Sequence, residues 1–186
     1  MEDTSGFIDV NVTDWFYEDV DWAYDNKLMV GVSNLFFEPG TSITGGMVVT
    51  VLARLADVDV SEYEDAEFED VYEGQWYTPY AKWAKSVGLV EGLPFNPPTE
   101  ISREWMGIVL VRYLDYVEKE YAVTDERVEF ADIDQISDEA MESMQILYKL
   151  GIFRGKGNNI MDPASDTTRA EFAALIHRVN NFVEED

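Results

Sequence analysis

Three diverged copies of one unit, each of roughly sixty residues, fill this sequence of 186 residues. Every copy opens on a Phe-x-Asp-Val-like tetrad, and these tetrads begin at Phe7, Phe68 and Phe130. A helical stretch, a connector with Gly and Pro, and a second helical stretch follow in the same order each time. So many ordered matches are not expected by chance. They predict repeats at 1–60, 61–124 and 125–186 that together form one compact domain.

Each repeat is expected to contribute two helices, because apolar side chains recur on one face of both stretches. In the second stretch of the first copy these are Val48, Val51 and Leu52. A helix pair this short cannot bury its apolar face alone. The predicted fold is therefore all-α, one compact pseudo-threefold domain of three helix-loop-helix repeats with short connectors. The first helices are predicted over 15–26, 76–87 and 138–150, the second helices are predicted to open at Thr44, Ser102 and Thr168, and the acidic segments 57–67 and 118–129 are predicted linkers.

The net charge of −25 limits the partners of this chain. Phosphate backbones are bound by basic surfaces, so nucleic acid is not an expected partner. Membrane insertion is not expected either, because no apolar run approaches the eighteen or so residues that span a bilayer. Of the thirteen Lys and Arg residues, only Lys27 and Arg54 fall within 1–66. Anion-binding chemistry is thus expected in the second and third repeats.

No motif in the sequence supports catalysis, and the chain is predicted not to be an enzyme. It has no cysteine, and it shows no zinc pattern, EF-hand loop, Gly-rich phosphate loop or nucleophile elbow. No metal and no cofactor are expected. His177, the single histidine, aligns with Ala53 and Val111 of the other copies and is interpreted as incidental.

The opening residues, 1–6, have neither a basic n-region nor an apolar core, so they do not predict a signal peptide. If the parent protein is secreted, we expect this sequence to be a fragment of it.

Several of the repeated features together resemble the S-layer homology family: the tetrad, the Trp of the first helix, the connector glycines, the Phe-x-Pro and, most literally, Thr168-Arg169-Ala170-Glu171. The resemblance covers nearly the whole chain. It implies three tandem modules that form a three-prong helical spindle and anchor a secreted bacterial protein non-covalently to the cell wall. It also implies an extracellular, wall-associated location and an anionic, often pyruvylated, secondary cell wall polysaccharide as the partner, bound in grooves between the prongs. In that family the motif Arg is a ligand-binding residue.

The residues themselves show why this Arg is unusual. Thr168 and Glu171 can form a capping box, which explains both of them structurally. Arg103 and Arg169 lie in a first helical turn, where the positive end of the helix dipole disfavours a cation. A guanidinium beside free backbone N–H groups is a good receptor for a carboxylate or phosphate. A buried salt bridge to an acidic neighbour in the next repeat is the alternative.

The copies also differ from the family pattern. The first reads Thr44-Gly45-Gly46-Met47 and has no Arg, and the third has Asp138 near the position of the first-helix Trp. At most two grooves are therefore expected to bind ligand, and the first repeat is interpreted as a structural prong.

The candidate ligand site follows from these comparisons. Arg103 and Arg169 are expected to clamp the acid group, and Trp76 with Gly92 and Gly155 to shape the pocket. Trp15 and Trp76 could stack on sugar rings or pack in the core, whereas Trp22 and Trp83 are predicted core residues. The tetrad carboxylates either bond nearby backbone amides or contribute to the groove; they are Asp9, Asp70 and Asp132.

A second hypothesis keeps the fold and changes the function. The missing Arg of the first repeat and the strong negative charge also suit a protein–protein interaction scaffold of the cell surface that has lost its sugar site. Its partner would be another surface protein. A passive spacer beside a catalytic domain is a third hypothesis.

Overall fold

The computed structural model describes residues 6–64, 66–68 and 70–185. Within these residues the fold is all-α, with no β-strand, as the sequence predicts. Three isolated bridges are the β-type pairings that it contains. The helices are α1 (Tyr17–Asp25), α2 (Gly45–Leu55), α3 (Thr78–Ser86), α4 (Arg103–Tyr116), α5 (Asp138–Lys149) and α6 (Arg169–Glu184), with short 3-10 turns η1 (Val60–Tyr63) and η2 (Ile133–Gln135).

The second helix of each repeat begins where its capping residue predicts. Thr44, Ser102 and Thr168 are the N-caps of α2, α4 and α6, and each side chain accepts a hydrogen bond from the backbone N–H three residues on. A complete capping box forms in α6, where Glu171 bonds back to the Thr168 amide. The predicted starts of these three helices are confirmed.

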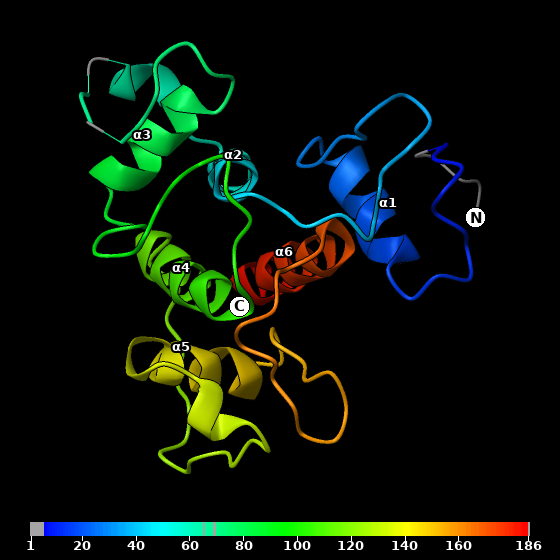
Figure 1. Ribbon diagram of the computed structural model, residues 1–186, viewed down its shortest axis with the longest axis vertical. Coiled ribbons are helices and arrows are strands. Elements are labelled where there is room, and N and C mark those ends of the chain that lie inside the picture. The colour runs from blue at the N-terminus through cyan, green and yellow to red at the C-terminus, as the bar shows by residue number, and fades with distance from the viewer. Residues whose placement is uncertain (1–5, 65, 69, 186) are drawn as a thin grey trace.

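Each prong pairs helices from two different repeats. Helix α1 packs against α6, α2 against α3, and α4 against α5, and Figure 1 shows α2, α4 and α6 around the centre with α1, α3 and α5 outside them. The second helix of one repeat thus shelters the first helix of the next. Because α6 of the third repeat covers α1 of the first, the three repeats form a closed arrangement.

A ring of backbone hydrogen bonds joins the three repeats at their centre. The Ile43 amide donates to the Thr167 carbonyl at 2.8 Å, the Thr167 amide to Ile101 at 3.1 Å, and the Ile101 amide to Ile43 at 3.3 Å. All three residues are buried, which removes water that would compete for these groups. The ring fixes the starts of α2, α4 and α6 relative to one another.

The first amides of α2, α4 and α6 are already occupied by the next repeat. In α6 the N–H groups of Arg169 and Ala170 donate to the carbonyls of Thr41 and Pro39, at 2.9 and 3.0 Å. The amides of Arg103 and Glu104 make the same contacts with the third repeat. The expectation of free N–H groups beside the two arginines is therefore wrong, and the connector carbonyls of the following repeat are the reason.

The tryptophans differ in how deeply they are buried. Trp83 is fully buried, as predicted, and Trp22 is half-buried against the core. Trp15 and Trp76 are 64% and 57% exposed, so the core interpretation does not hold for them.

His177 is not incidental. Its Nδ1 lies 2.8 Å from Asp19 Oδ1, and its ring stacks on Trp22 with the centroids 4.4 Å apart. Both partners belong to α1, more than 150 residues away in the chain, so no local pattern around His177 could reveal them.

Candidate functional site

Three cavities lie along the joints between successive repeats, and each is bounded mainly by a connector and the second helix of the same repeat. The α6–α1 groove, of about 280 Å³, adds Trp15 from the next repeat and Arg103 from the preceding one. The α2–α3 groove, of about 250 Å³, adds Trp76 and Arg169 in the same places. The α4–α5 groove, of about 590 Å³, has Ser137 and Glu139 in the place of the Trp and no corresponding Arg.

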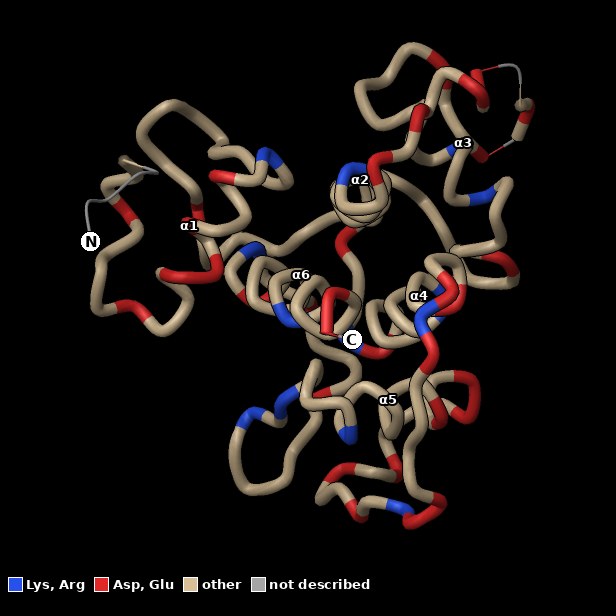
Figure 2. Tube along the Cα trace, turned by 180° about the vertical axis from the view of Figure 1, so that it is seen from behind, with Lys and Arg blue, Asp and Glu red and all other residues tan. Residues whose placement is uncertain are grey.

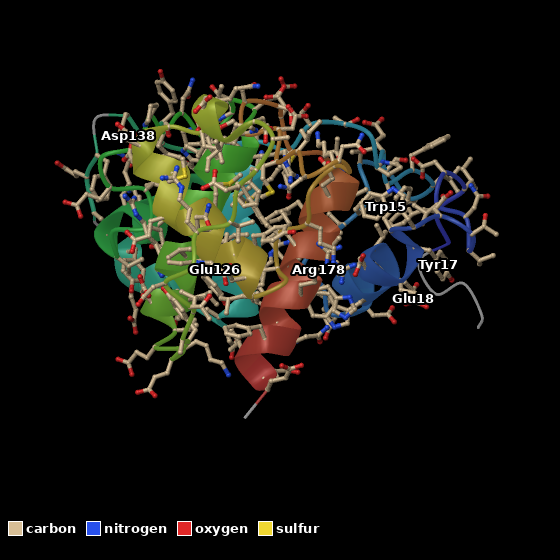
Figure 3. All side chains as sticks on the ribbon, turned by 90° about the horizontal axis from the view of Figure 1, so that it is seen from below. Trp15, Tyr17, Glu18, Glu126, Asp138 and Arg178 are labelled. Atoms are coloured by element: carbon tan, nitrogen blue, oxygen red, sulfur yellow. The ribbon has the colours of Figure 1, made fainter. Side chains whose placement is uncertain are left out.

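The α6–α1 groove concentrates positive charge in a strongly acidic protein. Its lining includes one carboxylate, Glu171, and four cations, Arg103, Arg154, Lys156 and Arg178. In Figure 2 acidic residues are spread over all three lobes, and the fewer basic residues, which also occur on other helices, include those of the connector that leads into α6 and of α6 itself. In Figure 3 Trp15 lies beside the N-terminal part of α6, the helix that carries Arg178. The groove therefore offers an aromatic face next to a set of cations.

Arg103 forms the buried end of this groove. Its Nε donates to the Met161 carbonyl at 2.9 Å and its Nη2 to the Arg154 carbonyl at 3.2 Å, and its side chain is almost entirely buried. The Nη1 atom lies 3.8 Å from Glu171 Oε1. Burial lowers the pKa of Arg103, and the Glu171 charge opposes that shift. The anion receptor and the buried salt bridge that the sequence suggested for Arg103 are therefore both incomplete descriptions, because backbone carbonyls of the third repeat are its main partners.

Asp132 fixes the connector segment at Met161, which Arg103 contacts. Its carboxylate accepts hydrogen bonds from the amides of Met161 and Asp162, the shortest at 2.7 Å. Asp9 does the same for Phe37 and Glu38 in the first repeat. The expected bonds to backbone amides exist, but across the connector rather than within the local turn. They set the carbonyl of Met161 in place for Arg103.

Lys156 carries a second charge network at the groove. Its Nζ lies 3.0 Å from both Asp162 Oδ2 and Ser165 Oγ, and 3.8 Å from Glu171. The hydrogen bond from Lys156 holds the pKa of the Asp162 carboxyl below its usual value. Gly155 lies between Arg154 and Lys156 and must be glycine, because a Cβ there would approach the Ile160 carbonyl oxygen to 2.8 Å.

Arg178 shows that this positive charge is only partly neutralised. Burial lowers the pKa of its guanidinium, and the neighbouring Arg154 and Arg103 charges lower it further, with Asp19 opposing. Its Nη1 donates to the Ile152 carbonyl at 3.1 Å. An anion in the groove would relieve this repulsion.

The α2–α3 groove repeats the design with less charge. Arg169 donates from Nε to the Phe37 carbonyl and from Nη2 to the Val30 carbonyl, both at 2.7 Å. Its guanidinium also lies over the Phe37 ring, 4.4 Å from the centroid. Arg54 and Trp76 complete the polar and aromatic lining, and the remaining walls are largely aliphatic.

The α4–α5 groove has lost the arginine. Gly45 occupies that position, and a Cβ on it would lie 3.1 Å from the Phe95 ring, so aromatic side chains fill the space of the missing guanidinium. Phe95 and Trp105 are stacked with their planes 12° apart. Asp70 of this repeat is exposed and pairs with Lys85 at 2.6 Å instead of holding the connector.

The predicted site residues therefore fall into separate places. Arg103, Gly155 and Trp15 share the α6–α1 groove, with Asp132 behind its connector. Arg169 and Trp76 share the α2–α3 groove. Gly92 and Asp70 line neither groove. The two arginines do not form one clamp, and the first repeat contributes to both grooves.

Sequence reasoning missed Arg154, Lys156 and Arg178 as groove residues. The available signal was the concentration of basic residues near the last Phe-x-Pro-like turn of an otherwise acidic chain. A comparison of the three repeats did not reveal this concentration of charge, because Arg154 and Lys156 have no basic counterparts in the other connectors.

Comparison with known proteins identifies the fold unit. Residues 129–173 match the model of the S-layer homology domain. The chain belongs to the S-layer homology family. An S-layer protein of Bacillus thuringiensis subsp. finitimus is 26% identical over 94% of this chain and 21% of its own length. A cellulosome-anchoring protein of Acetivibrio thermocellus is 25% identical over 76% of this chain and 33% of its own length.

An enzyme is also among the relatives. An amylopullulanase of Thermoanaerobacterium thermosulfurigenes is 30% identical over 88% of this chain but only 9% of its own length. The chain thus spans a small part of the relatives that it matches, and an S-layer homology region is not itself catalytic.

Family membership confirms the predicted resemblance and the cell-surface location, and it implies cell wall anchoring. S-layer homology domains bind cell wall polymers. No described helix is long and apolar enough to cross a membrane. Within the described residues, no group of potential ligand side chains is arranged to hold a metal ion.

Proposed function

We propose that the chain anchors its parent protein to the cell wall by binding an anionic, pyruvylated secondary cell wall polysaccharide, chiefly in the α6–α1 groove. The observation that carries this proposal is the set of four cations around a cavity of about 280 Å³ in a chain of net charge −25. Acidic surroundings repel anions over most of the surface, so a carboxylate-bearing sugar is favoured most strongly in this groove.

The groove supplies both kinds of contact that such a sugar needs. Arg154 and Lys156 lie at the exposed edge of the groove and can each donate charge-assisted hydrogen bonds, which contribute about 1.5–3 kcal/mol apiece. Trp15 presents an exposed indole for the apolar face of a sugar ring. Arg103 fixes the connector that carries them and offers its Nη1 edge from below.

The α2–α3 groove is proposed as the second, weaker binding site. It has two arginines and Trp76, and two guanidinium nitrogens of Arg169 and one of Arg54 donate to backbone carbonyls. Two occupied grooves on one polymer would raise the overall affinity through effective concentration.

Co-sedimentation with purified cell wall sacculi tests the proposal. The whole chain should sediment with sacculi and should remain in solution after acid removes the secondary polymer. A Trp15→Ala/Arg154→Gln variant should bind about tenfold more weakly, since it loses one stacking contact and one charged contact.

The matched control is Tyr72→Ala/Arg127→Gln, which also removes one exposed aromatic ring and one exposed positive charge, both outside the grooves. It should bind as the unaltered chain does. Binding that survives polymer removal, or an equal loss in both variants, would overturn the proposal.

A surface-protein partner is the second candidate, and one observation favours it. The first repeat exposes several large apolar side chains on its connector, including Val30, Leu35 and Phe36. Exposed apolar clusters mark contact surfaces. Cross-linking on intact cells, with sacculus binding abolished by polymer removal, would show such a partner.

A further inference from the structure

The α4–α5 groove differs from the other two in both charge and shape. It is the largest of the three, about 590 Å³. Its floor is apolar and includes Phe95, Ile101, Trp105 and Ile108. Neither Lys nor Arg is found among the described residues that line it.

Carboxylates surround this apolar floor. Glu100 comes from the second connector, Glu104 from α4, Glu139 from α5 and Asp166 from the third connector. Glu100, Glu139 and Asp166 are exposed at the mouth, whereas Glu104 accepts a hydrogen bond from the Ser137 amide at 3.1 Å. The groove is thus complementary to a ligand with several positive charges around an apolar group.

The aromatic residues here are not placed for stacking on a sugar. In the other two grooves an exposed indole stands at the rim, but in this groove that position belongs to Ser137 and Glu139. Trp105 is 8% exposed, and its Nε1 donates to the Pro94 carbonyl at 3.1 Å. Its ring also lies nearly parallel to that of Phe95, with the two centroids 6.2 Å apart.

We infer that the α4–α5 groove binds a basic polypeptide segment of a partner protein, in which Lys or Arg residues flank an aliphatic side chain. The aliphatic side chain would occupy the apolar floor, and the flanking cations would pair with the carboxylates at the mouth. This site is independent of the glycan sites, because the three grooves share no lining residue.

A short acetylated peptide of alternating Lys and Leu is a suitable probe for this site. Titrated into the whole chain, it should shift the indole N–H signal of Trp105 in ¹H–¹⁵N spectra and bind measurably by calorimetry. A peptide with Glu in place of Lys should do neither. Added salt should weaken the binding, because the rim charges are exposed.

Two triple variants of equal charge separate a groove from a general attraction to an acidic protein. Glu100→Gln/Glu139→Gln/Asp166→Asn removes the exposed groove carboxylates, and about tenfold weaker peptide binding is expected. Glu120→Gln/Asp125→Asn/Glu126→Gln removes three exposed carboxylates of the linker before α5 and should leave the affinity unchanged.

Equal losses in the two triple variants would overturn the inference, as would an unshifted Trp105 signal. A glucosamine oligomer that shifts Trp105 more than the peptide does would also overturn it, in favour of a glycan ligand. Sacculus binding should be unchanged in the groove variant, so failure of this inference would leave the proposed anchoring function standing.

Discussion

At the scale of single residues, Arg103 and Arg169 both bind connector carbonyls and line a groove. The sequence predicted only part of this. Their unfavourable position in a first helical turn singles them out. Their partners are carbonyls 51 to 139 positions away in the chain, on a different repeat. No local pattern encodes such contacts. The sequence could therefore single out the two arginines, but it could not predict their hydrogen bonds to these carbonyls.

This network predicts that Arg169 is needed for stability as well as binding. Arg169→Met would remove the donors of the Phe37 and Val30 carbonyls and should lower the free energy of unfolding by about 3 kcal/mol. Urea denaturation followed by circular dichroism measures this change. The exposed Arg127→Met should change it by less than about 0.5 kcal/mol. Equal stabilities of the two variants would show that the carbonyl contacts contribute little.

Asp162 provides a pH-dependent prediction at the same scale. Its folded pKa lies below the ordinary value of 3.8 because Lys156 donates to the carboxylate. The pair should therefore contribute its full stability above the unfolded pKa and lose it as the pH falls through the lower folded pKa. Carbonyl-detected NMR titration should show the Asp162 pKa rising in Lys156→Gln. An unchanged pKa would contradict the assigned cause.

At the scale of helices, capping chemistry made the starts of α2, α4 and α6 predictable. Thr44, Ser102 and Thr168 satisfy local rules that need no tertiary information. The first helices α1 and α3 begin about two residues later than predicted, because Trp15 and Trp76 belong to the turns before them. Boundaries set by turns are less visible in sequence than boundaries set by caps.

Glu171 links the cap of α6 to the charge of the α6–α1 groove. Glu171→Gln should keep the capping box, since an amide oxygen can accept the Thr168 hydrogen bond. It removes the carboxylate 3.8 Å from both Arg103 and Lys156. Binding to sacculi should therefore strengthen, by about two- to fivefold at low salt. Weaker binding with unchanged thermal stability would contradict the anion site.

At the scale of the whole molecule, the threefold arrangement was predictable, but the way in which helices pair was not. Apolar periodicity shows that α1 must be covered, and it does not say which helix covers it. The structure pairs α1 with α6, so every prong joins two repeats. The boundaries at 60 and 124 stay a prediction about sequence repeats, because these segments do not pack as separate units.

Shared prongs predict that the chain unfolds as one unit. The central ring of Ile43, Ile101 and Thr167 and the arginine contacts all cross between repeats. Urea transitions followed by tryptophan fluorescence and by far-ultraviolet circular dichroism should coincide. Two separate transitions would mean that a repeat can unfold while the others remain folded.

The anchoring account is tested most directly by the indole N–H signals of Trp15, Trp76 and Trp105, because each of these residues lines a different groove. The measurement is a ¹H–¹⁵N titration of the whole chain with secondary cell wall polymer released from sacculi. The account predicts that the Trp15 signal shifts first, that Trp76 follows at higher polymer concentration, and that Trp105 stays in place. A Trp15 signal that does not move at saturating polymer would contradict it.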